Sequence, residues 1–131
     1  MKYTAKSNTK GIWIQLMPRI NAAFREIFAM SPVHKEVYTK ARVDLPRYKK
    51  DGSVSKIPMV MFRCSGCKNL FNRKDCNVDH IKPVMPIGES IQTISIIKLF
   101  NRTFCDVDNL QVLCKECHKI KSKSENQERR V

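Results

Sequence analysis

The chain has 131 residues, with 25 lysines and arginines against 12 aspartates and glutamates, which gives a formal net charge of +13. This length supports one domain, or one small domain with an extension. The charge favours a nucleic-acid partner, because lysine and arginine side chains that neutralise phosphates release counterions. An anionic membrane surface is the competing partner, but the sequence has no lipidation motif, signal peptide or apolar run of transmembrane length. We therefore expect a soluble protein of a reducing cytosol.

The N-terminal part is predicted to be helical. Residues 1–11 carry three lysines and form either a mobile basic arm or a solvated terminus with no role. A helix is predicted from Ile14 to Met30, with Pro18 in its first turn, where the missing N–H group costs nothing. Trp13, just before it, is interpreted as a packing anchor rather than a base-stacking residue. The apolar face of this helix comprises Ile20, Ala23, Phe24, Ile27 and Phe28.

A second helix is predicted to begin at Ser31, which can act as the N-cap, with Pro32 at the first helical position. His34 on this helix is interpreted as an ordinary surface histidine. The residues expected to face the core are Val33, Val37 and Ala41.

A hairpin is predicted within residues 42–63, because an Asp-Gly turn signal at Asp51-Gly52 separates two short extended runs. The second run leads directly into the first cysteine pair. We expect either a basic hairpin that contacts the DNA backbone or a solvated, charged loop. The candidate DNA contacts on it are Arg47, Lys49, Lys50 and Lys56.

The positive charge is distributed unevenly along the chain. Residues 1–58 contain 12 basic and 4 acidic side chains, a net charge of +8, whereas residues 59–131 contain 13 and 8, a net charge of +5. This fits a basic N-terminal extension, residues 1–58, that grips DNA and precedes a second region, residues 59–131.

The second region is predicted to combine short strands with helices. Residues 91–101 are β-branched enough to leave a strand open, but their length and spacing favour a helix. A basic helix is predicted from Lys115 to about Asn126, with residues 127–131 fraying. Short strands are predicted at residues 69–71 and 76–81, and a strand or extended segment at residues 109–113.

Two Cys-x-x-Cys pairs, 46 residues apart, dominate this region. Zn²⁺ favours four thiolates in a tetrahedron, and each pair can supply two of them. Two disulfides or scattered buried thiols are the alternatives, but nothing in the sequence suggests an oxidising compartment. Cys76 and Cys105, which have no such partner, are interpreted as buried small hydrophobes. We predict a structural zinc site made by Cys64, Cys67, Cys114 and Cys117.

The cysteine pairs enclose or adjoin four polar residues, Asp79, His80, Asn109 and His118, which form a candidate catalytic site. His80 can accept a proton from water near neutral pH while its other nitrogen is held by a backbone carbonyl. Adjacent strand residues point to opposite sides, so Asp79 can hold a metal while His80 faces the attacking water. Asp79 and His118 would share a divalent ion, Mg²⁺ or Mn²⁺, with positions left open for phosphate oxygens.

These motifs resemble those of the HNH endonucleases, and more narrowly the zinc-stapled, phage-type HNH homing endonucleases. The matching stretches are Val78–Pro83 and Asn109–Lys119, and the resemblance covers roughly residues 60–126. It implies an α+β fold with a ββα-metal finger, preceded here by the helical and hairpin extension. In such a finger Asp79-His80 lies on the first strand, Asn109 near the second and His118 on the helix.

The resemblance also implies the role of each residue. Asp79 and His118 would be metal ligands and His80 the general base, while Asn109 would hold the loop between the strands and orient His80. In some relatives a later asparagine replaces the last histidine, so Asn109 as a metal contact stays open. The first motif position is aspartate here, a common variant of the histidine that gives the family its first letter. The implied reaction is hydrolysis of double-stranded DNA to 5′-phosphate and 3′-hydroxyl ends, in the cytoplasm of an infected bacterial host.

Two other functions compete with the nuclease. A non-catalytic zinc-ribbon DNA-binding protein would keep the cysteines and the charge, but would not need Asp79, His80 and His118 together. A structural or packaging accessory protein descended from a nuclease is the second rival. On the C-terminal helix, Lys119 and Lys121 are further candidate DNA contacts. Nicking and double-strand cleavage are both open, as are a monomer and a weak dimer.

Overall fold

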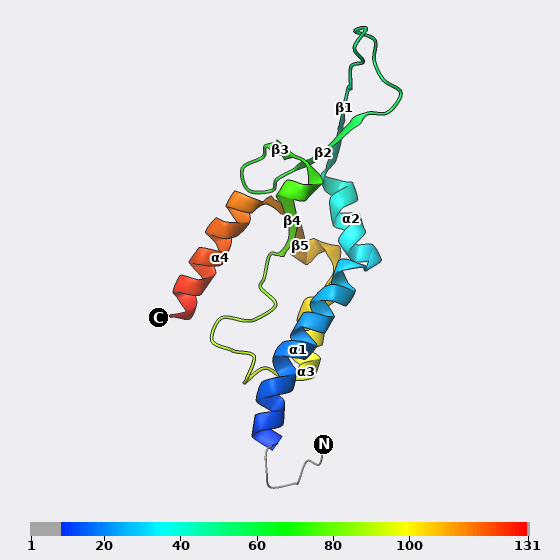
Figure 1. Cartoon of the computed structure of the whole chain (residues 1–131). Helices are drawn as coiled ribbons and strands as arrows, with labels where there is room; N and C mark the ends of the chain where they lie inside the picture. Colours follow the sequence, from blue (N-terminus) through cyan, green and yellow to red (C-terminus); the bar gives the residue numbers. More distant parts are fainter. Residues whose placement is uncertain (1–8, 131) are drawn as a thin grey trace.

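The computed structural model describes residues 9–130, and side chains from residue 16 onward. The interpretation of residues 1–11 as a basic arm or solvated terminus lies outside the described part for residues 1–8 and is wrong for residues 9–11, which belong to the first helix. The interpretation of the Trp13 side chain also lies outside the described part. Within it, helices and small antiparallel sheets are mixed, as expected for the α+β class (Figure 1). No helix among the described residues is long and apolar enough to cross a membrane.

Helix α1 (Thr9–Ala29) starts earlier than the predicted Ile14. Pro18 therefore lies inside the helix and not in its first turn. A proline inside a helix removes one backbone hydrogen bond and costs about 3 kcal/mol. Packing at the same turn opposes this cost, since Met17 is fully buried against Ile94 and Leu99. The predicted apolar face is correct for Ile20, Phe24 and Phe28 but wrong for Ile27, which is 54% exposed, and for Ala23, which is exposed.

Helix α2 (Pro32–Ala41) begins as predicted, with the Ser31 side chain accepting a hydrogen bond from the His34 N–H group at 3.2 Å. Val37 is buried in the largest core cluster. The same cluster takes in Phe28 from α1 and Val112 from the C-terminal half, so the packing crosses residue 58. The predicted division of the chain into a DNA-gripping extension, residues 1–58, and a second region, residues 59–131, stays a prediction about the function of each part.

A three-stranded antiparallel sheet follows, made by β1 (Arg42–Leu45), β2 (Met59–Arg63) and β3 (Leu70–Phe71). Strands β1 and β2 continue into a long hairpin that projects away from the rest of the molecule (Figure 1). Its end is closed by a bridge between Tyr48 and Val54 and by a turn in which Gly52 has a φ of +87°, a conformation that favours glycine. The predicted hairpin is therefore confirmed. We call residues 46–58, which are separate from the basic N-terminal residues 1–11, the arm.

A two-stranded antiparallel sheet and a helix carry the conspicuous motifs. Strand β4 (Cys76–His80) pairs with β5 (Leu110–Cys114), so that Asp79 lies opposite Gln111 and His80 opposite Leu110. Helix α4 (Lys115–Arg129) begins directly after β5, with Cys114 as its N-cap. It runs past the predicted end at Asn126, because the Arg129 guanidinium donates to the Met85 carbonyl at 2.7 Å and holds the last turn.

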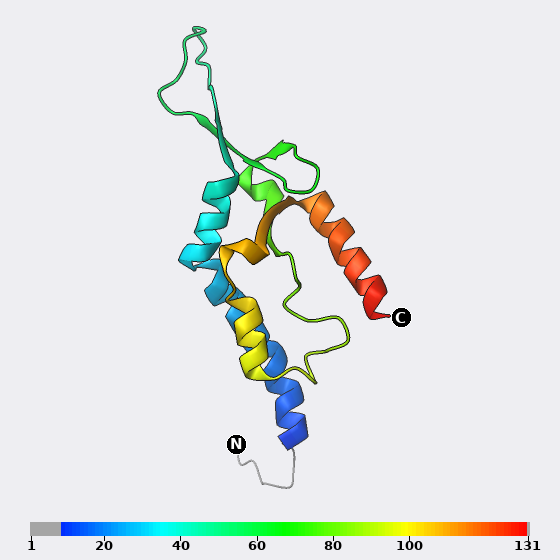
Figure 2. The same cartoon turned by 180° about the vertical axis from the view of Figure 1, so that it is seen from behind.

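Helix α3 (Ile96–Thr103) confirms a helix within residues 91–101, but it starts later, at the Ser95 cap. The Ser95 side chain accepts a hydrogen bond from the Lys98 N–H group at 3.1 Å. Figure 2 shows α3 lying along α1, on the other side of the molecule from α4. The long loop from residue 81 to 95 passes between these two sides (Figure 2).

Candidate metal centre and catalytic pocket

The four cysteines of the two Cys-x-x-Cys pairs converge although they come from separate elements. Cys64 follows β2, Cys114 ends β5 and Cys117 lies in the first turn of α4. Their sulfur atoms, with that of Cys67, all lie within 4.8 Å of one another, and the Cys67 and Cys114 sulfurs are 4.0 Å apart. Four sulfurs at about 2.3 Å from a tetrahedral zinc would be about 3.8 Å apart, so the cluster fits Zn²⁺.

The knuckle between Cys64 and Cys67 is shaped to admit four sulfurs. A Cβ atom on Gly66 would lie 2.9 Å from the Cys117 sulfur, so this position has no room for a side chain. The turn is closed by Lys68, whose N–H group donates to the Cys64 carbonyl at 3.0 Å. Lys68 has a φ of 66° and is the one non-glycine residue with positive φ in the described chain.

The electrostatics of the cluster favour a bound cation. Burial of Cys64 opposes its thiolate form, but N–H groups of Cys114, Cys67 and Gly66 point at its sulfur and lower its pKa to about 6. The Cys114 and Gly66 nitrogens are each 3.3 Å away. Conversely, hydrogen bonds to the Cys114 and Cys64 side chains favour the protonated thiol of Cys117 and raise its pKa to about 12. A bound dication would replace such protons and favour the thiolates.

The two remaining cysteines lie apart from the cluster. Burial, followed by the nearby Cys64 and Cys114, raises the pKa of Cys76 to about 11, so this thiol is neutral. Cys76 belongs to the largest core cluster, and half-buried Cys105 packs against it. Their interpretation as small hydrophobic residues is confirmed for Cys76 and holds in part for Cys105.

Asp79 is a buried carboxylate that faces α4, with only 8% of the residue exposed. The Gln111 amide donates to its Oδ2 atom at 3.0 Å across the strand pair. The Nε2 atom of His118 lies 3.8 Å from Oδ1, and the Nζ atom of Lys121 lies 3.3 Å from Oδ2. Lys121 also donates to the His80 carbonyl at 3.0 Å and pairs with Glu125.

The His80 ring faces the other way, towards α1 and α3. Its Nε2 atom is 2.9 Å from the Thr103 carbonyl oxygen, and its ring centroid is 4.9 Å from that of Phe28. A carbonyl can only accept, so this bond places the proton on Nε2 and leaves Nδ1 as the free acceptor. The expected divergence of Asp79 and His80 from adjacent strand positions is therefore present.

Asn109 holds the chain after β4. Its side-chain oxygen accepts from the Lys82 N–H group at 2.9 Å, its side-chain amide donates to the Lys82 carbonyl at 3.3 Å, and its carbonyl accepts from the Ile81 N–H group at 2.8 Å. These contacts fix the segment that follows His80. Asn109 does not line the pocket described next, so the alternative in which it contacts metal gains no support.

One pocket of about 360 Å³ brings Asp79, His80 and His118 together. It lies between α1, β4 and α4, and the titratable residues that sequence analysis did not place there but that line it are Arg25, His34, Lys121 and Glu125. We call it the Asp79 pocket. The helical spacing of His118, Lys121 and Glu125 could have revealed their common face on α4.

His34 is not the surface residue that was expected. Its ring lies 5.5 Å from the rings of both Phe28 and Tyr38, and its Nδ1 atom is buried without a hydrogen-bond partner. Burial, followed by the positive charges of Arg73 and His80, lowers the pKa of His34 below its ordinary value of 6.5. His34 is thus half-buried rather than an ordinary surface histidine, because α2 packs this ring against Phe28 of α1, which the helical pattern alone does not reveal.

The candidate DNA contacts occupy two kinds of position. Those of the arm, and Lys119 on α4, are exposed: Arg47, Lys49, Lys50, Lys56 and Lys119. Lys121 instead points into the Asp79 pocket, where its ammonium is surrounded by oxygen atoms.

Comparisons of this chain with protein-family models, with curated proteins and with solved structures found no match. The proposed function therefore rests on the arrangement of the side chains.

Proposed function

We propose that this chain is a metal-dependent DNA endonuclease of the HNH type, which hydrolyses phosphodiester bonds to 5′-phosphate and 3′-hydroxyl ends. The observation that supports it most is that Asp79, His80 and His118 line one pocket beside the four-cysteine cluster. On this proposal β4, β5 and α4 form the ββα-metal finger. The phage-type homing endonucleases remain the narrower proposal.

The separation of Asp79 and His118 suits two ligands of one divalent ion. Octahedral ligands with bonds of about 2.1 Å lie about 3 Å apart when adjacent and about 4 Å apart when opposite. The observed distance between Oδ1 and Nε2 is 3.8 Å, which lies between these two values, so a small movement of the side chains would bring both atoms to the same ion. Mg²⁺ or Mn²⁺ bound there would neutralise charge on the scissile phosphate and on the leaving oxygen.

His80 is suited to act as the general base. Its Nε2–H group is held by Thr103, so the Nδ1 atom can take a proton from the attacking water. The Phe28 ring packs against the imidazole and limits its rotation. A positioned base of this kind contributes about 10²- to 10⁴-fold to the rate.

The zinc site would act indirectly, through the position of His118. This residue follows Cys117, a member of the cysteine cluster, in the first turns of α4. Cys114 ends β5, the strand that faces β4 and carries Gln111, the hydrogen-bond donor to Asp79. A zinc ion held by the cluster would therefore order both ligands of the catalytic ion.

DNA binding is supported by charge. The net charge of +13 favours polyanions, and the exposed arm carries Arg47, Lys49, Lys50 and Lys56 against the single acid Asp51. We infer that the arm grips the DNA backbone while the Asp79 pocket receives a phosphate. The cytoplasm of an infected bacterial host is the location that this proposal implies.

A non-catalytic zinc-ribbon DNA-binding protein is the second candidate, and one observation favours it. The ammonium of Lys121 pairs with both Asp79 and Glu125, so that a purely structural salt-bridge network could account for the buried carboxylate. The two candidates make opposite predictions about metal-dependent cleavage.

The test is incubation of supercoiled plasmid with purified zinc-loaded protein and Mg²⁺ or Mn²⁺, with and without EDTA. Wild type is expected to nick or linearise the DNA only with metal, whereas His80→Ala should cut about 10²- to 10⁴-fold more slowly while keeping its zinc and its DNA affinity. Phage genomic DNA serves as a second substrate in case the plasmid lacks the recognition site. DNA binding without cleavage of either substrate would favour the zinc-ribbon candidate.

A further inference from the structure

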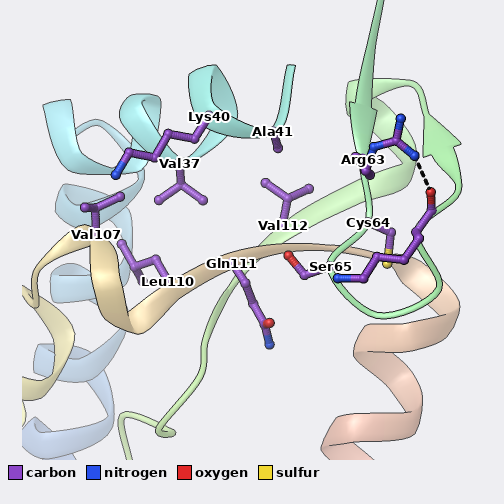
Figure 3. A pocket seen from close by; sticks show the side chains of 11 residues that line it. Val37, Lys40, Ala41, Arg63, Cys64, Ser65, Val107, Leu110, Gln111 and Val112 are labelled. Carbon is purple, nitrogen blue, oxygen red and sulfur yellow. Dashed lines mark hydrogen bonds between the residues drawn. The ribbon is translucent and has the colours of Figure 1, made fainter. Parts of the chain in front are cut away.

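A second pocket, of about 240 Å³, lies on the opposite face of β5 from Asp79. Its floor is apolar and is formed by α2, β5 and the turn before β5, with Val37, Leu110 and Val112 at its centre (Figure 3). The Gln111 side chain, which reaches Asp79, leaves β5 on the other side from Val112 (Figure 3). We call this second cavity the Arg63 pocket.

Cations line the rim of this pocket. Lys40 lies at one end and Arg63 at the other (Figure 3). Further polar residues of the lining are Ser65, Lys68 and Gln111. None of the described residues that line the pocket is acidic. Glu36 pairs with Lys40 at 3.8 Å, but both side chains are more than half exposed, so this pair neutralises little.

The zinc knuckle holds two of these groups in place. The Arg63 guanidinium donates to the Lys68 carbonyl at 2.7 Å, which links the end of β2 to the end of the knuckle turn. The Ser65 N–H group donates to the Val112 carbonyl at 2.8 Å and fixes the knuckle against β5. The arrangement of the rim therefore depends on the same turn as the cysteine cluster.

Lys68 occupies a backbone conformation that glycine would adopt without strain. Its φ of 66° lies in the left-handed region, where a residue with a Cβ atom is disfavoured. The turn requires this backbone conformation, but it does not require a lysine side chain. Lysine at position 68 therefore adds a cation to the pocket at the expense of backbone strain.

From these observations we infer that the Arg63 pocket binds a backbone phosphate of double-stranded DNA. Arg63 and Lys68, which lie together at the knuckle end of the pocket, would contact this phosphate, and Lys40 at the other end would contact the next one along the strand. The apolar floor between them would face the carbon atoms of the deoxyribose that joins the two phosphates. The pocket lies at the base of the hairpin, because β2 ends at Arg63, so it extends the DNA-contacting surface from the arm to the zinc knuckle. The inference rests on the proposed function only in taking DNA as the partner.

The test is the affinity of Lys68→Gly for a 24-base-pair duplex, measured without added Mg²⁺ or Mn²⁺ so that cleavage plays no part. Glycine removes the charge and relieves the strain, so the variant should bind zinc and melt no lower than wild type. One lost phosphate contact should reduce the slope of log affinity against log salt by about 0.9, which corresponds to about eightfold weaker binding at 0.1 M salt. Lys40→Gln, a change on the exposed face of α2, should have the same effect.

Two controls decide the result. Lys68→Arg keeps the charge and should bind DNA as wild type does, whereas Lys74→Gln removes an exposed charge outside the pocket and should change the slope much less. The inference is overturned if Lys68→Gly and Lys40→Gln bind with the wild-type slope, if Lys74→Gln has an equal effect, or if wild type does not bind the duplex. A failure of the nuclease proposal would appear separately, in the plasmid assay.

Discussion

The ammonium of Lys121 lies 3.3 Å from the Oδ2 atom of Asp79, on the carboxylate whose Oδ1 atom faces His118. The same ammonium donates to the carbonyl of His80. A positive charge is thus held at the carboxylate to which a catalytic metal ion would bind. Since like charges repel, the ammonium and a divalent ion compete for Asp79.

Lys121→Met removes this competitor and keeps the length of the side chain. We expect the Mg²⁺ concentration that gives half-maximal cleavage to fall by about fivefold, since removing a like charge nearby is worth on the order of 1 kcal/mol. Titration of the cleavage rate with Mg²⁺ measures this. Lys123→Met, an exposed position on the same helix, is the control. An unchanged half-maximal concentration would show that the Lys121 contact does not compete with metal.

Removal of zinc should abolish cleavage even at saturating Mg²⁺. The cysteine cluster fixes β5 and the first turn of α4, and structural zinc contributes on the order of 10 kcal/mol to a small site. Cys117→Ser should lower the zinc content, destabilise α4 and cut DNA at a background rate, as followed by metal analysis and circular dichroism. Cys105→Ser, outside the cluster, should retain one zinc per chain. A folded Cys117→Ser protein that cleaves normally would rule out this dependence.

The features that could be predicted from the sequence depend on contacts between near neighbours. The Cys-x-x-Cys spacing predicts the metal site because it indicates a local turn. Ser31 and Pro32 predict the start of α2 because they act within one turn. The hairpin followed from its Asp-Gly turn.

The features that could not be predicted depend on tertiary packing. Helix α1 continues through Pro18 because Met17 packs against α3, which lies about 80 positions away. The group that holds His80 is the backbone carbonyl of Thr103. Every residue has a backbone carbonyl, so the sequence does not show which one accepts this hydrogen bond. His34 was misplaced because nothing in a helical pattern reports that the helix before it covers that face.

Charge removal on the arm should weaken DNA binding without affecting the fold. Lys49 and Lys50 are exposed, so the double variant Lys49→Gln/Lys50→Gln should change the free energy of unfolding by no more than about 0.5 kcal/mol for each substitution. If each lysine contacts one phosphate, the salt slope of duplex binding falls by about 1.8. The matched control is Lys35→Gln/Lys74→Gln, which removes two exposed lysines outside the arm. Equal slopes for the two double variants would mean that the arm has no special role.

The lowered pKa of His34 predicts a stability that depends on pH. Burial, Arg73 and His80 all disfavour its charged form in the folded protein, whereas the unfolded chain keeps the ordinary value of 6.5. Between the two pKa values the unfolded chain binds more protons, so stability is complete above about pH 6.5 and falls as the pH drops through this window.

The variant His34→Phe tests this origin, because phenylalanine retains a ring between Phe28 and Tyr38 but cannot be protonated. The melting temperature of wild type should fall between pH 7.5 and pH 5.5, and the fall should be smaller in His34→Phe. Protonation of the cysteine cluster lowers stability in both proteins and therefore cancels in the comparison. Identical losses in the two proteins would assign the pH dependence to other groups. A smaller loss in the variant would confirm that the packing of neutral His34 lowers stability once the solution is acidic enough to protonate its ring.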